Sequence, residues 1–344
     1  MQNGNSKGLR NYSLNPHFSH IYIERAAADF ALTRDVLRRF PRARVIEIDN
    51  YKAIFNRGRQ DWRLQKRSPK LILAVKPDGF LYPATAVLPT FGESHSYYNS
   101  LMLNCLYDCD YCYLQGMYPS ANVVIFVNLE DFYAATDAAL AKHALSLAIS
   151  YDTDLLAFEG IIPLCRKWIE FASTRPGLTI EIRTKSANFA SIKDMLPGKG
   201  VILAWTLSPP SVVERYESRT ASLPSRLEAI RDALELGWKV RLCFDPVLAV
   251  PGWRDLYAEL IESVFSEIPK AKLHDVCTGS FRMNSAYLSD LQRRRNDSEI
   301  VFHPMLRDGE GTMHYPPGLR GEIDAHLLAT LTQHLPRERI FTIS

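Results

Sequence analysis

Three of the six cysteines lie within eight residues, as Cys105, Cys109 and Cys112 in the spacing C-x3-C-x2-C. Three thiols are too few for a closed tetrahedral zinc site and too crowded to pair off into disulfides. Three thiolates can hold three irons of a [4Fe-4S] cube and leave the fourth iron open. The spacing therefore predicts an iron–sulfur cluster, with a chance grouping or an unusual zinc knuckle as the alternatives.

An aromatic residue, Tyr111, stands directly before Cys112. With it, the segment resembles the cysteine motif of the radical S-adenosylmethionine (SAM) enzymes. The resemblance implies that the open iron binds the amino and carboxylate groups of SAM, and that the reduced cluster cleaves SAM to a 5′-deoxyadenosyl radical. The implied cofactors are a [4Fe-4S] cluster and SAM, and reduction of the cluster implies an external electron donor.

Composition limits the class of protein. The chain has 344 residues, of which 47% are hydrophobic and 23% charged, so it is long enough for one large or two ordinary globular domains. A net charge of +3 neither requires nor excludes a nucleic-acid partner. No apolar run of about 18 residues occurs and the first twenty residues lack the apolar core of a signal peptide. We expect no membrane partner and a cytoplasmic location, where thiols stay reduced.

The chain before the cysteines is expected to form an extension. Residues 1–18 are polar and predicted to be mobile, and residues 19–95 begin with an apolar pattern typical of a small β-α-β unit. Residues 51–70 then carry seven Lys and Arg residues against one acidic residue, Asp61, which predicts a basic loop. This loop is either a solvated linker or an arm that contacts phosphates through Arg57, Arg59, Lys66 and Arg67.

From residue 71 onward, strand patterns alternate with helix patterns, which favours parallel strands joined by right-handed crossovers. About six β/α units follow the cysteines, so we predict an α/β fold whose residues 96–280 form an open, partial (β/α)6 barrel with its chemistry at the carboxyl ends of the strands. Residues 281–344 are expected to form a C-terminal extension with a hairpin turn near Asp308-Gly309 and a helix over 319–335. The expected barrel strands include 123–127, 145–149, 179–184, 201–207, 239–244 and 275–279.

Between about residues 20 and 270 the sequence resembles the spore photoproduct lyase family of radical SAM enzymes, which revert a thymine dimer in spore DNA. Residues 109–115, Cys-Asp-Tyr-Cys-Tyr-Leu-Gln, match that family's run after the second cysteine. Further similar segments follow at comparable spacings: residues 127–129, 169–171, 184–185, 217–226 and 251–253. The resemblance implies a DNA lesion or a nucleotide-like molecule as the substrate.

The resemblance also implies roles for single residues. Cys105, Cys109 and Cys112 would ligate the cluster. Lys185, Thr206 and Thr153 fall where the family places polar contacts to SAM, and the two threonines keep the hydroxyl of the family's serines. Tyr111 and Tyr113 match a tyrosine pair that takes part in radical transfer.

One position departs from the family. Its hydrogen-donor cysteine, which returns a hydrogen atom to the product radical, falls on Tyr151. Three interpretations remain open. Tyr151 itself donates; or Cys243, which shares a strand face with Asp245, replaces the donor; or the substrate is not a thymine dimer.

Asp245 is a second departure, since the family tends to have a small apolar residue there. Its carboxylate is expected to bind a ribose hydroxyl or a cationic substrate group, or to pair with an arginine. Cys165 and Cys277 are expected to be core thiols, and the charge run 293–295 a solvated or basic face. The sequence thus predicts a radical SAM, lyase-like enzyme, with a non-catalytic nucleic-acid-binding protein that keeps a structural or sensing cluster as the alternative.

Overall fold

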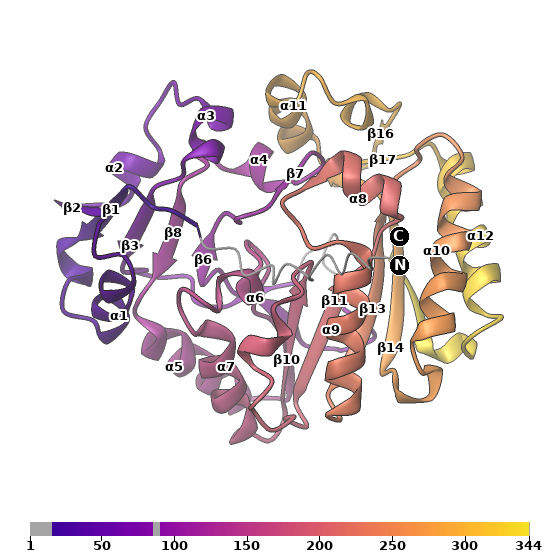
Figure 1. Ribbon diagram of the computed structural model, residues 1–344, viewed down its shortest axis with the longest axis horizontal. Coiled ribbons are helices and arrows are strands. Elements are labelled where there is room, and N and C mark those ends of the chain that lie inside the picture. Colours follow the sequence, from indigo (N-terminus) through magenta and orange to yellow (C-terminus); the bar gives the residue numbers. More distant parts are fainter. Residues whose placement is uncertain (1–15, 85–89, 344) are drawn as a thin grey trace, which may run out of the picture.

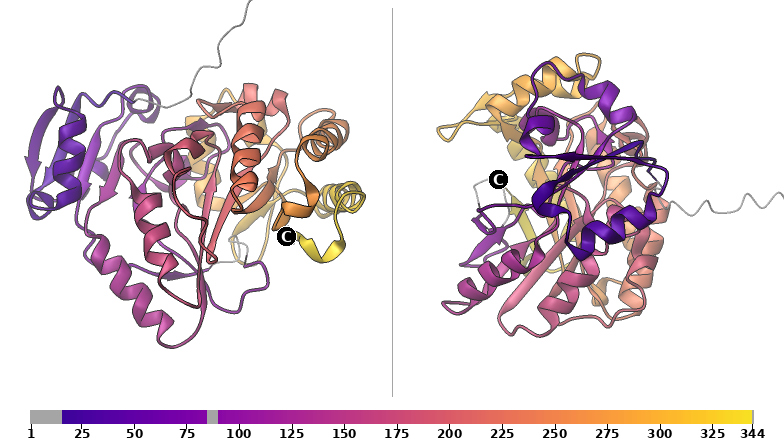
Figure 2. Two further views of the ribbon diagram at one scale, coloured as in Figure 1. Left: turned by 60° about the horizontal axis from the view of Figure 1, so that its bottom comes forward. Right: turned by 90° about the vertical axis from the view of Figure 1, so that its left-hand side faces the viewer.

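The computed structural model describes residues 16–84 and 90–343, whose two largest sheets lie side by side (Figure 1). The larger sheet has eight strands in the order β18-β14-β13-β11-β10-β9-β5-β4. All neighbours in it are parallel except β4, which pairs antiparallel with β5 at one edge. Helices pack along its outer face (Figure 2), so the predicted open, partial α/β barrel is confirmed.

The elements follow the expected alternation closely. The barrel strands are β4 (Tyr82–Pro83), β5 (Ser96–Tyr98), β9 (Leu145–Ala148), β10 (Leu178–Thr184), β11 (Val201–Thr206), β13 (Lys239–Val247), β14 (Asp275–Ser280) and β18 (Ile340–Ile343). The helices between and after them are α5 (Leu129–Leu140), α6 (Leu155–Phe158), α7 (Leu164–Ser173), α8 (Pro210–Tyr216), α9 (Leu223–Glu235), α10 (Trp253–Glu267), α11 (Ser285–Arg294) and α12 (Pro317–Leu331).

The smaller sheet is built from the N-terminal part of the chain and has the order β2-β1-β3-β8-β6. The predicted β-α-β unit is confirmed as β1 (His20–Glu24), α1 (Ala31–Arg39) and β2 (Arg44–Ile48). β3 (Leu71–Ala74) lies next to β8 (Val123–Phe126), and β6 (Met102–Leu103) pairs with β8 and forms one edge of the sheet. The assignment of strand 123–127 to the barrel was therefore wrong, because β8 hydrogen-bonds to β3 and not to a barrel strand.

The basic segment 51–70 is not a loop. It contains α2 (Lys52–Phe55) and α3 (Trp62–Arg67), and the Asp61 carboxylate caps α3 by accepting a 2.9 Å hydrogen bond from the Leu64 amide. The sequence pattern did not reveal these helices, because each is too short to show a helical period. Residues 1–15 of the N-terminal segment predicted to be mobile lie outside the described residues.

The C-terminal region returns to the barrel. The predicted hairpin is present as β16 (Leu306–Arg307) and β17 (Thr312–His314), to which β15 (Arg282–Asn284) adds a third strand. Gly311 adopts a φ of 87° in its turn, a conformation that glycine accepts without strain. The predicted helix corresponds to α12. β18 was not predicted, and it pairs with β14, so the barrel sheet extends beyond the predicted limit at residue 280.

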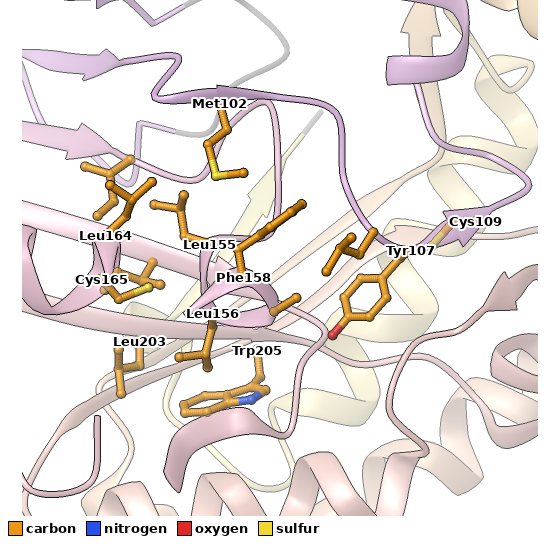
Figure 3. Close-up of a cluster of buried hydrophobic side chains, with 14 of the residues drawn as sticks. Met102, Tyr107, Cys109, Leu155, Leu156, Phe158, Leu164, Cys165, Leu203 and Trp205 are labelled. Carbon is orange, nitrogen blue, oxygen red and sulfur yellow. The ribbon is translucent and has the colours of Figure 1, made fainter. Parts of the chain in front are cut away.

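Buried side chains from both faces of the strands form a continuous core. Figure 3 shows part of it, where Met102, Leu155, Phe158 and Trp205 gather beside Tyr107 and the cysteine segment. Cys165 is fully buried there, as expected of a core thiol. Among the described residues, no helix is both long enough and apolar enough to cross a membrane.

Candidate active site

The carboxyl ends of the barrel strands surround a cavity of about 300 Å³. Its wall combines thiols, phenols and charged side chains, a mixture typical of a reaction site rather than of a packed core. All of the predicted site residues except Cys243 line this cavity: Cys105, Cys109, Cys112, Tyr111, Tyr113, Tyr151, Thr153, Lys185, Thr206 and Asp245.

The cysteine segment is fixed by hydrogen bonds at both ends. Asn104 adopts a φ of 72°, and its buried amide donates to the carbonyl oxygens of Ser120 and Asn122 at 2.7 Å each. β7 (Asp108–Cys109) pairs antiparallel with β12 (Glu217–Ser218), which places Cys109 opposite Glu217. These contacts fix the backbone that carries the thiols.

α11 holds the segment from the other side. Arg294 donates to the carbonyl oxygens of Gln115 and Tyr118, and Arg295 donates to the Asp108 carboxylate. A Cβ on Gly116, in α4 (Leu114–Met117), would lie 2.1 Å from the Tyr287 carbonyl oxygen of α11, so only glycine permits this approach. The interpretation of run 293–295 as a solvated charged face was therefore wrong for Arg294 and Arg295.

Lys66 also points inward, toward the cysteines. Its side chain is buried and its Nζ donates a 2.6 Å hydrogen bond to the Cys105 carbonyl oxygen, so this residue cannot contact phosphates as the sequence suggested. Burial raises the pKa of the Cys105 thiol to about 12 and also raises that of Cys112, while the Lys66 charge opposes both shifts. Lys66 therefore stabilises negative charge on the sulfur atoms, as a thiolate-bound cluster requires.

We expect Lys66→Met to lower the midpoint potential of a reconstituted cluster by on the order of 50 mV, because one positive charge near the thiolates is lost. The measurement is a reductive titration followed by electron paramagnetic resonance. Arg67→Met is the matched control, since Arg67 is the neighbouring exposed cation at the end of α3. Equal potentials in Lys66→Met and the unchanged protein would contradict this role.

A buried ion pair lies behind Tyr111. Glu217 and Arg226 are both fully buried and are joined by a 2.5 Å salt bridge, and Glu217 also accepts hydrogen bonds from the hydroxyls of Tyr111 and Ser208. Burial alone would raise the pKa of Glu217, but the charges of Arg226 and Lys185 outweigh it and lower the pKa to about 2. Glu217 therefore stays ionised and fixes the orientation of Tyr111.

Lys185 extends from the end of β10 over this cluster. Its Nζ lies 5.5 Å from the centre of the Tyr111 ring. Burial would lower the pKa of Lys185, but Glu217 and Cys109 outweigh that effect and raise the pKa above its ordinary value. The side chain is thus a partly buried cation in the cavity wall, suited to an anionic or oxygen-rich ligand group.

Asp154 positions the backbone around Lys185. Its carboxylate accepts 2.7 Å hydrogen bonds from the Thr184 hydroxyl and from the Lys185 amide. It also caps the start of α6, because it accepts a 3.1 Å hydrogen bond from the Ala157 amide. The neighbouring Thr153 hydroxyl is buried in the cavity wall and has no hydrogen-bond partner in the described structure. A buried hydroxyl without a partner at this place is suited to a hydrogen bond with a polar ligand atom.

Tyr113 and Tyr151 contact each other across the cavity, with ring centres 5.6 Å apart. The Tyr113 hydroxyl donates to the Tyr151 carbonyl oxygen, and it lies 3.3 Å from the Asp152 carboxylate. Two of the three predicted tyrosines are therefore brought into direct contact, while Tyr111 is bound separately by Glu217.

Asp245 lies between two arginines. Its carboxylate accepts from Arg282 at 2.8 Å and from Arg183 at 3.2 Å, and these cations outweigh burial and keep the pKa of Asp245 below its ordinary value. Of the three roles open for Asp245, arginine pairing is the one that the structure shows. Arg282 is part of the cavity wall.

Cys243 is fully buried in a small apolar cluster with Ala204 and Cys277. It lies two residues before Asp245 on β13, opposite Cys277 on β14, and does not belong to the cavity lining. The Cys243 thiol therefore has no direct contact with the space in which a substrate would bind.

The residues present fit the two cofactors that the cysteine motif implies. Within the described residues, no three His, Cys, Asp or Glu side chains gather closely enough to hold a single metal ion. The three thiols instead surround a shared cavity, together with the Lys185 ammonium and the orphaned Thr153 hydroxyl. Thiolates would hold a cluster, and the ammonium and hydroxyl would hold the polar groups of SAM.

A partial β/α barrel with three cysteines grouped at the carboxyl ends of its strands defines a radical SAM enzyme of the lyase-like type. The match to a family model is more particular. Residues 16–284 match the model for spore photoproduct lyase, which spans more than half of the chain, and the chain belongs to that family.

Known proteins agree with this assignment. The chain is 23% identical to the spore photoproduct lyase of Clostridium acetobutylicum over 266 residues, covering 74% of this chain and 76% of that one. It is 23% identical to that of a Geobacillus species over 187 residues, covering 53% and 55%. A mutant spore photoproduct lyase with bound AdoMet and dinucleoside spore photoproduct superposes with a TM-score of 0.77 at 17% identity, covering 95% of this chain and 98% of that chain.

Proposed function

We propose that this protein reductively cleaves SAM at a [4Fe-4S] cluster and abstracts a hydrogen atom from a DNA lesion or a nucleotide-like substrate. The observation that carries the proposal is the convergence of Cys105, Cys109 and Cys112 on the cavity that also holds Lys185 and Thr153. An external donor would supply the electron for the cluster. The cytoplasm is the fitting compartment, because its reducing conditions preserve such clusters.

The proposed roles follow from the contacts. The three cysteines ligate the cluster, and Lys185, Thr153 and Thr206 bind SAM through polar groups that face the cavity. Asp245 contributes indirectly, because it is already paired and holds Arg183 and Arg282 in the wall. Tyr111 is oriented by Glu217, whereas Tyr113 is in contact with Tyr151.

Tyr151 is the proposed hydrogen donor to the product radical. It lies in the cavity wall and a phenol O–H bond is weak enough to give up a hydrogen atom. Cys243 is the weaker candidate, since it is fully buried and does not line the cavity. The family resemblance supports a nucleotide-like substrate, and the solved relatives include one complexed with dinucleoside spore photoproduct.

The function is tested with anaerobically reconstituted protein, dithionite, SAM and deuterium-labelled candidates that include dinucleoside spore photoproduct and intact nucleotides. Transfer of deuterium into 5′-deoxyadenosine in the presence of one candidate supports the proposal and identifies its substrate. Nucleic-acid binding without any 5′-deoxyadenosine would favour the alternative, a non-catalytic protein with a structural or sensing cluster.

We expect Tyr151→Phe to lower the ratio of repaired product to 5′-deoxyadenosine by about tenfold, because the phenyl ring retains the packing but has no O–H to donate. The measurement is chromatography of both products after single turnover. Tyr97→Phe serves as the control, since Tyr97 stacks on His143 away from the cavity lining. An unchanged ratio in Tyr151→Phe would remove Tyr151 from the donor role.

A further inference from the structure

Four tyrosine side chains form an unbroken series of ring contacts, which we call the tyrosine series: Tyr113, Tyr151, Tyr98 and Tyr82. The ring centres are 5.6 Å apart for Tyr113 and Tyr151, 4.4 Å for Tyr151 and Tyr98, and 5.1 Å for Tyr98 and Tyr82. The first two residues line the cavity. The series therefore connects the cavity with the edge of the barrel sheet.

Strand pairing places these rings in contact. Tyr98 on β5 lies opposite Ala148 at the end of β9, and Tyr151 follows β9 by three residues. On the other side, Tyr82 on β4 lies directly opposite Tyr98 in an antiparallel pair. Because β4 is the edge strand of the sheet, Tyr82 is the outermost member, and its side chain is partly exposed.

Such a series of phenol rings can conduct an electron hole, which moves as a phenoxyl radical from one tyrosine to the next. Each member is a phenol, so a phenoxyl radical can pass between neighbours with little change in free energy. Ring contacts at these distances keep each step short. The carboxylate of Asp152 lies within reach of the Tyr113 hydroxyl and can retain its proton locally. Tyr111 differs, because its hydroxyl is bound to the carboxylate that Arg226 neutralises.

We propose that Tyr98 and Tyr82 form a relay that returns Tyr151 to its reduced state from outside the barrel, a step that rests on the proposed function of Tyr151 as hydrogen donor. The Tyr151 O–H bond breaks and a C–H bond forms on the product radical, which leaves a Tyr151 phenoxyl radical. One electron then passes from Tyr98 to Tyr151, a second from Tyr82 to Tyr98, and a third from a one-electron reductant to Tyr82.

The net reaction of the relay consumes one electron and one proton for each Tyr151 radical. The electron comes from a reduced flavin or iron–sulfur electron-transfer protein at the partly exposed Tyr82, and the proton comes from water. Tyr98 and Tyr82 each release a phenolic proton to water when they are oxidised and take one back when they are reduced, so atoms and electrons balance. A packing role requires the aromatic rings but not their hydroxyl groups, whereas the relay requires the hydroxyl groups. Removal of a hydroxyl group therefore distinguishes the relay from a structural role.

The relay is tested in the full chain with 3-aminotyrosine placed at position 113 as a radical trap. A photo-oxidised ruthenium tris-bipyridine complex removes an electron at the protein surface, and electron paramagnetic resonance detects the aminotyrosyl radical. We expect Tyr98→Phe to slow its formation by about tenfold. Tyr97→Phe, one residue along the same strand, is expected to leave the rate unchanged, because its ring stacks on His143 and not on the tyrosine series.

Equal rates in the parent and in Tyr98→Phe would overturn the relay, as would an equal fall in both phenylalanine variants. Thermal melting of each variant shows that the fold is retained, and phenylalanine preserves the ring contacts. The assay requires neither SAM nor a substrate. A failed relay therefore leaves the proposed function standing, and absence of 5′-deoxyadenosine release leaves the rates in this assay unaffected.

Discussion

Cys112→Ala is expected to leave a folded chain that binds no stable [4Fe-4S] cluster and releases 5′-deoxyadenosine only at the background rate. The reason is that three thiolates are the minimum for a cube with one open iron, and Cys112 is one of the three that line the cavity. Iron and sulfide content after anaerobic reconstitution and the visible absorbance of the cluster measure the first effect. Product release with dithionite and SAM measures the second.

Cys165→Ala is the matched control for this change. Cys165 is a fully buried thiol in α7 and does not line the cavity, so its loss costs packing but no cluster ligand. We expect the control to bind iron as the parent protein does. A full cluster in Cys112→Ala, or an equal loss of iron in both variants, would contradict the assignment of the ligands.

Local sequence patterns were sufficient for much of this fold. Patterns among neighbouring residues show the cysteine spacing, the β-α-β unit at residues 20–48 and the alternation from β9 to β14. The structure confirms the β-α-β unit and the alternating strands and helices. Buried parallel strands such as β11 read as apolar runs because helices or other strands cover both faces. The hairpin near Gly311 was equally local.

Contacts between distant segments were not predictable in the same way. β18 pairs with β14 although more than fifty residues separate them, and β8 joins a sheet that begins at β1. Each of these strands has an apolar pattern compatible with either sheet, and only the packing of the whole chain selects the partner. The boundaries predicted after residues 95 and 280 therefore separated strands that pair with each other in one sheet.

The same limit explains which site residues were missed. Lys66 and Arg295 were taken for surface charges, since a lone Lys or a charged run is usually solvated. In the fold they reach the cysteine segment across 39 and 187 positions of sequence, respectively. A positive charge that reaches a site from such a distant position in the sequence leaves no local pattern. Lys66 and Arg295 could therefore be assigned to the site only from the structure.

Arg226→Met is expected to have the largest effect on stability. It would leave the fully buried Glu217 carboxylate without its guanidinium partner, and breaking a buried ion pair from one side costs about 3–5 kcal/mol. The measurement is the free energy of unfolding from urea titrations. The fall should be accompanied by weaker SAM binding, because Glu217 also holds the Tyr111 hydroxyl.

The double variant Glu217→Gln/Arg226→Met separates the stranded charge from the loss of packing. It removes both ionised groups while it keeps similar side-chain volumes, so we expect it to recover a large part of the stability that Arg226→Met loses. A double variant that is no more stable than Arg226→Met would show that the guanidinium matters through its bonds to the Thr206 and Ala221 carbonyl oxygens instead.

The pH dependence gives the sign of the electrostatic effect. In the parent protein the pKa of Glu217 is lowered to about 2, so its contribution to stability is present above its ordinary pKa and is lost only as the pH falls toward 2. In Arg226→Met, burial is no longer opposed by Arg226, and the pKa of Glu217 should rise. Protonation then neutralises the stranded carboxylate, so the destabilisation measured at about pH 5 should be smaller than that at about pH 8. A penalty that is the same at both pH values would mean that the cost of Arg226→Met comes from packing and not from charge.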